Sequence, residues 1–230
     1  MRGSIIAGFA RVAIGGEAPS ASAARSTRSR AGGIRVIRTS PPQSSSAVLG
    51  EAKVDKNTGA MIAIPMPPQV TRPLLGLAKG LGTPQDASQM HATLAFIPDK
   101  TEFDSAKRSV LEWAVERVAR EFLPARANVS GVGVFSNLNE EMGGYPYVAT
   151  INAPGLDTMR AKLFEAIHRI GTISSNFVFI PHITLGYDPG KASIPRPADI
   201  PKVEWIMDSV AVYWDWDAPS RVWTFEKKAA

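Results

Sequence analysis

The residues with the clearest chemical signature are two histidines that share one four-residue pattern. His91-Ala-Thr93-Leu and His182-Ile-Thr184-Leu repeat His-x-Thr-Leu in the two halves of the chain, and they use two of its three histidines. From this composition we expect only about 0.01 such matches per chain by chance. Because side chains alternate along a strand, each His and its Thr should point to one face, with apolar anchors on the other.

This pattern is suited to a phosphodiester. A neutral imidazole can take a proton from an attacking water or ribose hydroxyl, and an imidazolium can protonate the leaving oxygen. Hydroxyl groups can donate hydrogen bonds to the non-bridging oxygens, whose charge grows in the transition state. We therefore predict that His91 and His182 act as acid and base, in either order, and that Thr93 and Thr184 hold the phosphate. The chain offers no clustered carboxylates for a metal ion, so we predict no metal and no other cofactor.

The surrounding elements follow the order strand, helix, strand twice, with one motif in each half. We expect strands at 61–66, 91–97, 129–135, 145–151 and 177–187, a short helix at 71–82, and a hairpin of 210–216 with 221–225. A capping box at Thr101–Asp104 is predicted to open a second helix. The apolar stripes of the second and third helices are Phe103, Ala106, Val110, Ala114, Val118 and Phe122, then Leu156, Met159, Leu163, Ile167 and Ile170. The predicted fold class is α+β, with two similar lobes of antiparallel sheet plus helices and one His-x-Thr strand from each lobe facing a central cleft.

Composition separates a basic leader from a nearly neutral body. The chain has 230 residues, no cysteine and a net charge of +5, but residues 1–50 hold seven Arg and one acid and so carry +6. We predict that 1–57 is a disordered Arg/Ser/Ala-rich leader and that 58–230 is the catalytic domain. The leader could be a flexible or virion-packaging arm, a weak polyanion-binding tail or an organellar transit peptide. No apolar run approaches the ~20 residues of a membrane-spanning helix, so we expect a cytoplasmic protein, or an organellar one if the leader is a transit peptide.

These features resemble the two-histidine (2H) phosphoesterase superfamily, the LigT-like or 2′-5′ RNA ligase-like proteins. The likeness rests on the paired motif, on Pro181 before the second His and on the Gly-Val-Gly-Val-Phe135 strand, and it covers about Thr58 to Phe225. The opening Thr58-Gly-Ala-Met-Ile-Ala-Ile is similar to the branch found in tailed phages. Some members of that branch destroy cyclic-oligonucleotide signals of bacterial defence (anti-CBASS activity), which would place the protein in the host cytoplasm.

The resemblance implies a metal-independent phosphodiesterase acting on a cyclic oligonucleotide. The alternatives are an RNA-end processing enzyme acting on a 2′,3′-cyclic phosphate or 2′-5′ linkage, and a non-catalytic nucleotide-binding virion module. Many relatives carry a basic residue after the second motif, whereas this chain has Gly186-Tyr187, so phosphate binding should depend more on hydroxyls and backbone donors.

Three aromatic residues are weaker candidates for substrate binding. Trp214 and Trp216 could stack on a base, although core packing is the alternative for both. Tyr187 lies five positions after His182, an odd offset that places it on the opposite strand face unless a bulge intervenes. The third histidine, His168, falls outside the apolar stripe of its helix and is expected on the surface.

Overall fold

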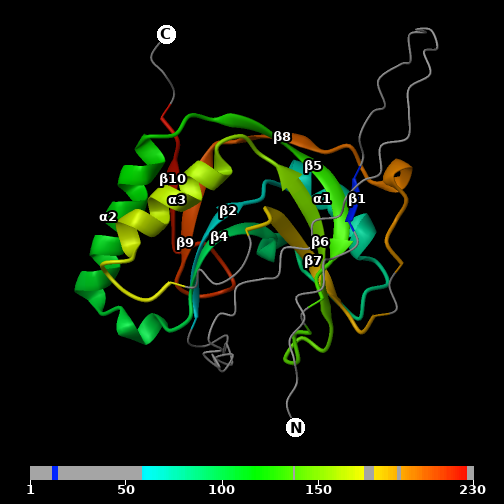
Figure 1. The fold of residues 1–230 in the computed structure, drawn as a ribbon, viewed down its shortest axis with the longest axis horizontal. Helices are drawn as coiled ribbons and strands as arrows, with labels where there is room; N and C mark the ends of the chain where they lie inside the picture. The colour runs from blue at the N-terminus through cyan, green and yellow to red at the C-terminus, as the bar shows by residue number, and fades with distance from the viewer. Residues whose placement is uncertain (1–11, 15–58, 137, 174–178, 191–192, 227–230) are drawn as a thin grey trace, which may run out of the picture. The chain divides into compact units, whose positions relative to one another are not determined.

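Two antiparallel sheets form the framework of the chain (Figure 1). The computed structural model describes residues 12–14, 59–136, 138–173, 179–190 and 193–226. The six-stranded sheet has the order β1-β5-β6-β7-β3, with β8 also paired to β5, and the four-stranded sheet has the order β10-β9-β2-β4. The strands of the first sheet are β1 (Val12–Ile14), β5 (Ala125–Val134), β6 (Tyr145–Asn152), β7 (His182–Asp188), β3 (Thr83–Pro84) and β8 (Glu204–Met207); those of the second are β10 (Arg221–Thr224), β9 (Ser209–Tyr213), β2 (Ala60–Pro65) and β4 (His91–Ile97).

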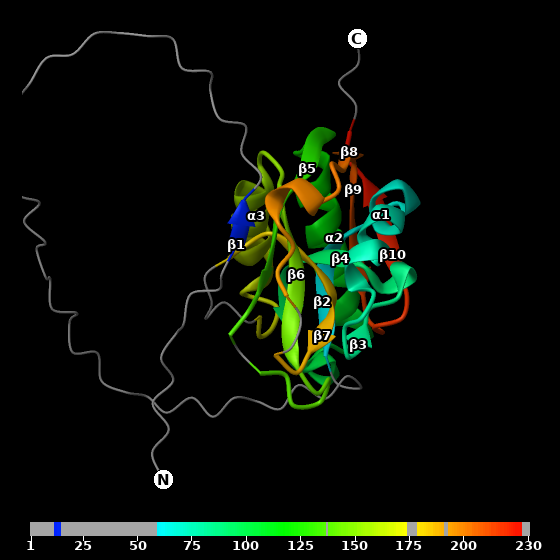
Figure 2. The same cartoon turned by 90° about the vertical axis from the view of Figure 1, so that its right-hand side faces the viewer.

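Three helices pack on these sheets. Helix α1 (Pro68–Ala78) contacts β7 and β8, whereas α2 (Ser105–Arg120) contacts β9 and β10. Helix α3 (Leu156–Ile167) lies beside α2 (Figures 1 and 2). It also contacts β4. The buried residues of both sheets and all three helices join in one large apolar core. This arrangement confirms the predicted α+β fold of two antiparallel sheets plus helices.

The predicted helical stripes differ in accuracy. In α3 the residues Leu156, Met159, Leu163 and Ile167 are buried, as the spacing predicted. In α2 the prediction was partly wrong, because Leu111 and Val115 are fully buried and Val110 is 49% exposed. Apolar residues occupy both neighbouring rows of this helix, so the sequence spacing alone does not decide which row faces the core.

The start of α2 was also predicted wrongly. The N-cap is Asp104, whose carboxylate accepts a hydrogen bond from the Lys107 amide at 2.8 Å. Thr101 instead belongs to a separate one-turn 3-10 helix, Lys100–Glu102, capped by Asp99. Asp104 satisfies a free amide of the first turn directly, which is why the helix begins after it.

Other element boundaries shift at prolines. Strand β7 begins at His182, and the predicted strand residues 179–181 are not part of it, because Pro181 has no amide to donate to a ladder. Residues 177–178 of the predicted strand lie outside the described residues. Helix α1 begins earlier than predicted, with Pro68 in its first turn, where the fixed φ of proline suits a helix. The short strands β3 and β8 were not predicted.

Of the predicted leader, the structure describes only Val12–Ile14. This strand, β1, pairs antiparallel with β5, in the register Val12 to Gly133. The rest of the predicted leader lies outside the described residues, and its disorder stays a prediction. Within the described part of the chain, no helix has the length and apolar character needed to cross a bilayer.

Candidate functional site

The two motifs come together because β4 and β7 contact each other. Each strand begins with its motif histidine, and the two histidines and two threonines are half-buried. The residues between and after them, Ala92, Leu94, Ile183 and Leu185, are buried in the core. The structure therefore holds each His-x-Thr pair on one strand face and anchors it from the other face, as the alternation predicted.

Both motif strands contain a register shift directly after the threonine. In β4 the pairing with β2 skips Leu94, and in β7 the pairing with β6 skips Leu185. An extra residue in a strand reverses the alternation beyond it. Both strands accordingly show the same burial pattern, in which the first, third and sixth residues are half-buried and the others are buried.

The shift in β7 places Tyr187 on the motif face. It pairs with Pro146, which lies on the same face of β6 as Val148, the partner of Thr184. Burial raises the pKa of the Tyr187 hydroxyl, and the nearby charge of Glu141 raises it further. Tyr187 is thus a neutral hydroxyl on the motif face of β7, beyond Thr184, and the bulge that would bring it to this face is present.

Gly186 is required where β3 pairs with β7. A Cβ added there would lie 2.6 Å from the Thr83 carbonyl oxygen, well inside contact distance. The close approach lets β3 pair with β7 immediately after the bulge and so supports the position of Tyr187.

His182 makes two contacts that fix its ring, a hydrogen bond at one nitrogen and a contact with an aromatic ring. Its Nδ1 lies 2.6 Å from the Ile180 carbonyl oxygen, so Nδ1–H donates to that carbonyl and Nε2 is left for chemistry. The Phe135 ring contacts it in a T-shaped arrangement at a centroid distance of 4.8 Å. Burial lowers the pKa of His182, while the Ile180 hydrogen bond opposes that shift.

His91 also packs against an aromatic ring. Its ring lies 5.5 Å from that of Tyr213, and its buried Nδ1 has no hydrogen-bond partner among the described residues. Burial lowers the pKa of His91 to about 4, and the charge of His182 adds to this shift. The Gln89 backbone opposes the shift, although its geometry is not that of a full hydrogen bond. The two imidazoles are therefore close enough to interact electrostatically.

An apolar cluster borders His91 and Thr93 on the four-stranded sheet. It is separate from the main core and consists of Met61, Ala63, Ala211 and Tyr213, with Phe96 and Trp216 packed against it. The Thr93 hydroxyl makes a weak 4.0 Å contact to the Met61 sulfur. Trp216, which the sequence indicated as a possible substrate-binding residue, thus lies on the face of this sheet that carries His91 and Thr93. Its ring is 5.8 Å from the Phe96 ring.

Trp214 does not join this cluster, which corrects the expectation that it could stack on a base. Strand alternation turns it toward α2, where it is buried and its Nε1–H donates to Glu112 at 2.9 Å. The Arg108 guanidinium lies 4.7 Å from its ring. Its surroundings are those of a structural residue.

Several residues at the site were missed by the sequence reasoning. Phe96 could have been found, because it stands five positions after His91 just as Tyr187 does after His182. Thr150 of β6 is the strand partner of His182, and its hydroxyl lies 3.1 Å from that of Ser130. This pair depends on strand register, which no local pattern reveals.

Arg160 of α3 contacts β4 and the segment that precedes β7. Its Nε donates to the Leu94 carbonyl at 3.1 Å, at the bulge of β4. Its guanidinium also lies 4.8 Å from the ring of Phe179, three residues before His182. Arg160 therefore holds the backbone of the first motif at Leu94 and contacts the segment that leads into the second.

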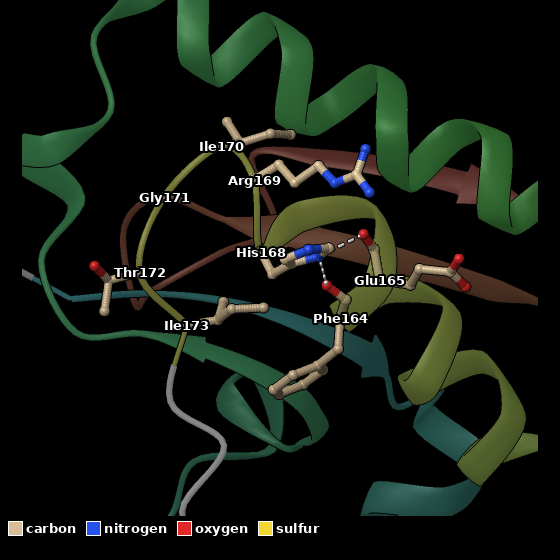
Figure 3. A pocket seen from close by; sticks show the side chains of 8 residues that line it. All are labelled: Phe164, Glu165, His168, Arg169, Ile170, Gly171, Thr172 and Ile173. Carbon is tan, nitrogen blue, oxygen red and sulfur yellow. Dashed lines mark hydrogen bonds between the residues drawn. The ribbon is translucent and has the colours of Figure 1, made fainter.

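Two surface pockets lie away from the motif histidines. One is formed at the end of α3, as Figure 3 shows, and the other lies between α2 and α3 around the exposed Trp113. In the first, the Nδ1 of the exposed His168 contacts the carbonyl oxygens of Glu165 and Phe164, at 2.7 and 3.2 Å, so it serves the helix end. No group of three His, Asp or Glu side chains in the described ranges could hold a metal ion.

Two antiparallel sheets that each bring one His-x-Thr strand to a shared site define a LigT-like fold. Among similar solved structures, TT0787 of Thermus thermophilus matches with a TM-score of 0.53 and 23% identity, over 67% of this chain and 86% of its own. Escherichia coli LigT complexed with 3′-AMP matches with a TM-score of 0.54 and 18% identity, over 74% of this chain and 99% of its own. Its complex with NADP+ gives 0.53 over the same shares.

The sequence profile of the 2′-5′ RNA ligase superfamily matches residues 77–216, and the chain belongs to this superfamily. Membership supports a phosphoesterase activity in general terms. None of the curated proteins matches the chain.

Proposed function

We propose that this protein is a phosphodiesterase that cleaves a ribose-linked phosphodiester with two histidines. The observation that carries the proposal is the pair of His-x-Thr faces on the contacting strands β4 and β7. Their imidazoles interact, so protonation of one disfavours protonation of the other. A pair that shares one proton supplies an acid and a base at the same time.

The surroundings of the two rings favour His91 as the base and His182 as the acid. An imidazolium needs an acceptor for each N–H, and the Ile180 carbonyl accepts from His182 Nδ1. Burial lowers the pKa of His91 to about 4, and the ring lies against Tyr213, so its neutral form is favoured. His91 would take the proton of the attacking hydroxyl while that oxygen bonds to phosphorus. His182 would protonate the leaving oxygen as its bond to phosphorus breaks.

Hydroxyl groups would hold the phosphate in place of basic side chains. Thr93 and Thr184 lie two residues after their histidines on the same strand face. The Thr93 hydroxyl has only a weak contact to a sulfur, so turning toward a phosphate oxygen costs little. Donors placed where charge develops in the transition state stabilise it most.

The surroundings of the histidines favour a small substrate. The apolar cluster at Met61 and Tyr213 offers aromatic surface, and residues 51–230 carry 19 basic and 20 acidic side chains. A long RNA held through many phosphates would need a basic surface. We therefore propose a cyclic di- or trinucleotide as the substrate. RNA-end processing and nucleotide binding without cleavage are the competing functions.

Turnover at two salt concentrations separates these functions. Cyclic di- and trinucleotides are compared with an RNA ending in a 2′,3′-cyclic phosphate, and products are identified by mass spectrometry. We expect linear products from the cyclic oligonucleotides and a shallow dependence on salt. Preference for the RNA with a steep salt dependence would assign RNA-end processing, and intact ligands throughout would assign a binding module. The variant His168→Ala, altered outside the site, serves as the control.

A further inference from the structure

The two motifs are longer than the four residues that first identify them. Each reads His-x-Thr-Leu-x-aromatic, with Phe96 ending the first and Tyr187 ending the second. A straight strand would turn the sixth residue away from the first. Here the bulge at Leu94 or Leu185 reverses the alternation in both strands, and both aromatic residues are half-buried on the motif face. The duplication therefore includes a β-bulge in each strand, and each bulge places an aromatic residue on the same face as the histidine and threonine.

Each ring is supported by its own sheet. Phe96 pairs with Met61 and packs against Trp216, and Gly59 leaves room for it, because a Cβ there would lie 3.0 Å from the ring. Tyr187 pairs with Pro146 on one side and with Thr83 on the other. The supported rings remain partly accessible, and such aromatic surfaces stack with nucleobases of any identity.

The distance from the phosphate-binding threonines suits a base on each side. Thr93 and Phe96 are three positions apart with one residue taken up in the bulge, so about two strand rises, or ~7 Å, separate their backbones. The same count applies to Thr184 and Tyr187. This is close to the span from a phosphate to the base of its own nucleotide.

We infer that the site has two base-binding subsites, one formed by Phe96 and one by Tyr187, and that it takes phosphodiesters flanked by a nucleobase on both sides. The inference rests on the proposed function and deepens it, since it favours internal linkages of oligonucleotides over terminal cyclic phosphates. In this role Phe96 and Tyr187 determine specificity and take no part in proton transfer.

Equilibrium binding tests the subsites without relying on turnover. The probe is the deoxydinucleotide d(ApA), which has no 2′-hydroxyl that could attack its own phosphodiester, and the comparison compounds lack one base or the other. In the wild type we expect removal of either base to weaken binding about 5- to 150-fold. Phe96→Leu should abolish the effect of removing one base and Tyr187→Leu that of removing the other. Tyr187→Phe should keep the base preference, and Trp113→Leu, which removes an aromatic ring 56% exposed on α2, is the matched control.

Equal affinity of the wild type for all three compounds would overturn the inference, as would variants that weaken all three compounds equally. Loss of the same base preference in both leucine variants would overturn the assignment of one base to each lobe. If the base preferences appear but no diester is cleaved, the subsites stand and the proposed catalysis fails.

Discussion

The half-buried His91 makes the stability of the fold depend on pH. Its pKa falls from 6.5 to about 4 on folding, so between these values the unfolded chain binds a proton that the folded chain does not. Because the folded pKa is depressed, the neutral His91 leaves the folded state at full stability above pH 6.5. That stability is lost progressively as the pH falls from 6.5 through about 4. Lowering the pH from 7.5 to 5 should therefore reduce the free energy of unfolding by about 2 kcal/mol through His91.

Urea unfolding followed by tryptophan fluorescence measures this loss. The free energy of unfolding is compared at pH 7.5 and pH 5 for the wild type, for His91→Asn and for His168→Asn. The difference between the two pH values should shrink by about 2 kcal/mol in His91→Asn and stay at the wild-type value in His168→Asn. His182 remains in all three proteins, so its burial acts on the pH difference in each of them. An unchanged pH difference in His91→Asn would refute the reasoning that the ring is neutral because it is buried.

Three further predictions concern catalysis and packing. Since burial lowers the pKa of both motif histidines, the dependence of kcat/KM on pH should be bell-shaped, with its maximum below pH 6.5 and a decline below about pH 4. A maximum above pH 7.5 would contradict the assigned roles. Trp214→Phe should lower the free energy of unfolding by about 1–2 kcal/mol, through loss of the Glu112 hydrogen bond, and leave KM unchanged; a raised KM at unchanged stability would return Trp214 to the site. Arg160→Met should reduce kcat roughly 10- to 100-fold with little change in KM, and Arg160→Lys should restore part of the lost kcat. Equal rates in wild type and Arg160→Met would show that the contacts to Leu94 and Phe179 do not position the motifs.

The sequence predicted those parts of the fold that depend on local pattern. The strand at His91, the buried stripe of α3 and the hairpin of β9 with β10 follow from periodicity and turn residues. Periodicity failed in α2, where apolar residues fill two adjacent rows and only tertiary packing selects Leu111 over Val110.

The site was predictable only in its repeated core. The His-x-Thr pattern is visible in sequence, whereas the direction of the next aromatic residue depends on a bulge. A bulge arises from pairing with a second strand, and Leu94 and Leu185 carry no local sign of it. Thr150 reaches His182 for the same reason, through the register of β6 with β7. Alternation correctly separates Tyr213 from Trp214, once the strand position is known.

The central claim, that two histidines perform the cleavage, is tested most directly by product formation in single-histidine variants. Wild type, His91→Ala and His182→Ala are incubated with a cyclic dinucleotide, and the linear product is quantified by mass spectrometry beside circular dichroism of each protein. Each variant should keep its fold and lose about 10²- to 10⁴-fold in rate. A folded variant of either histidine that forms product at the wild-type rate would contradict the two-histidine mechanism.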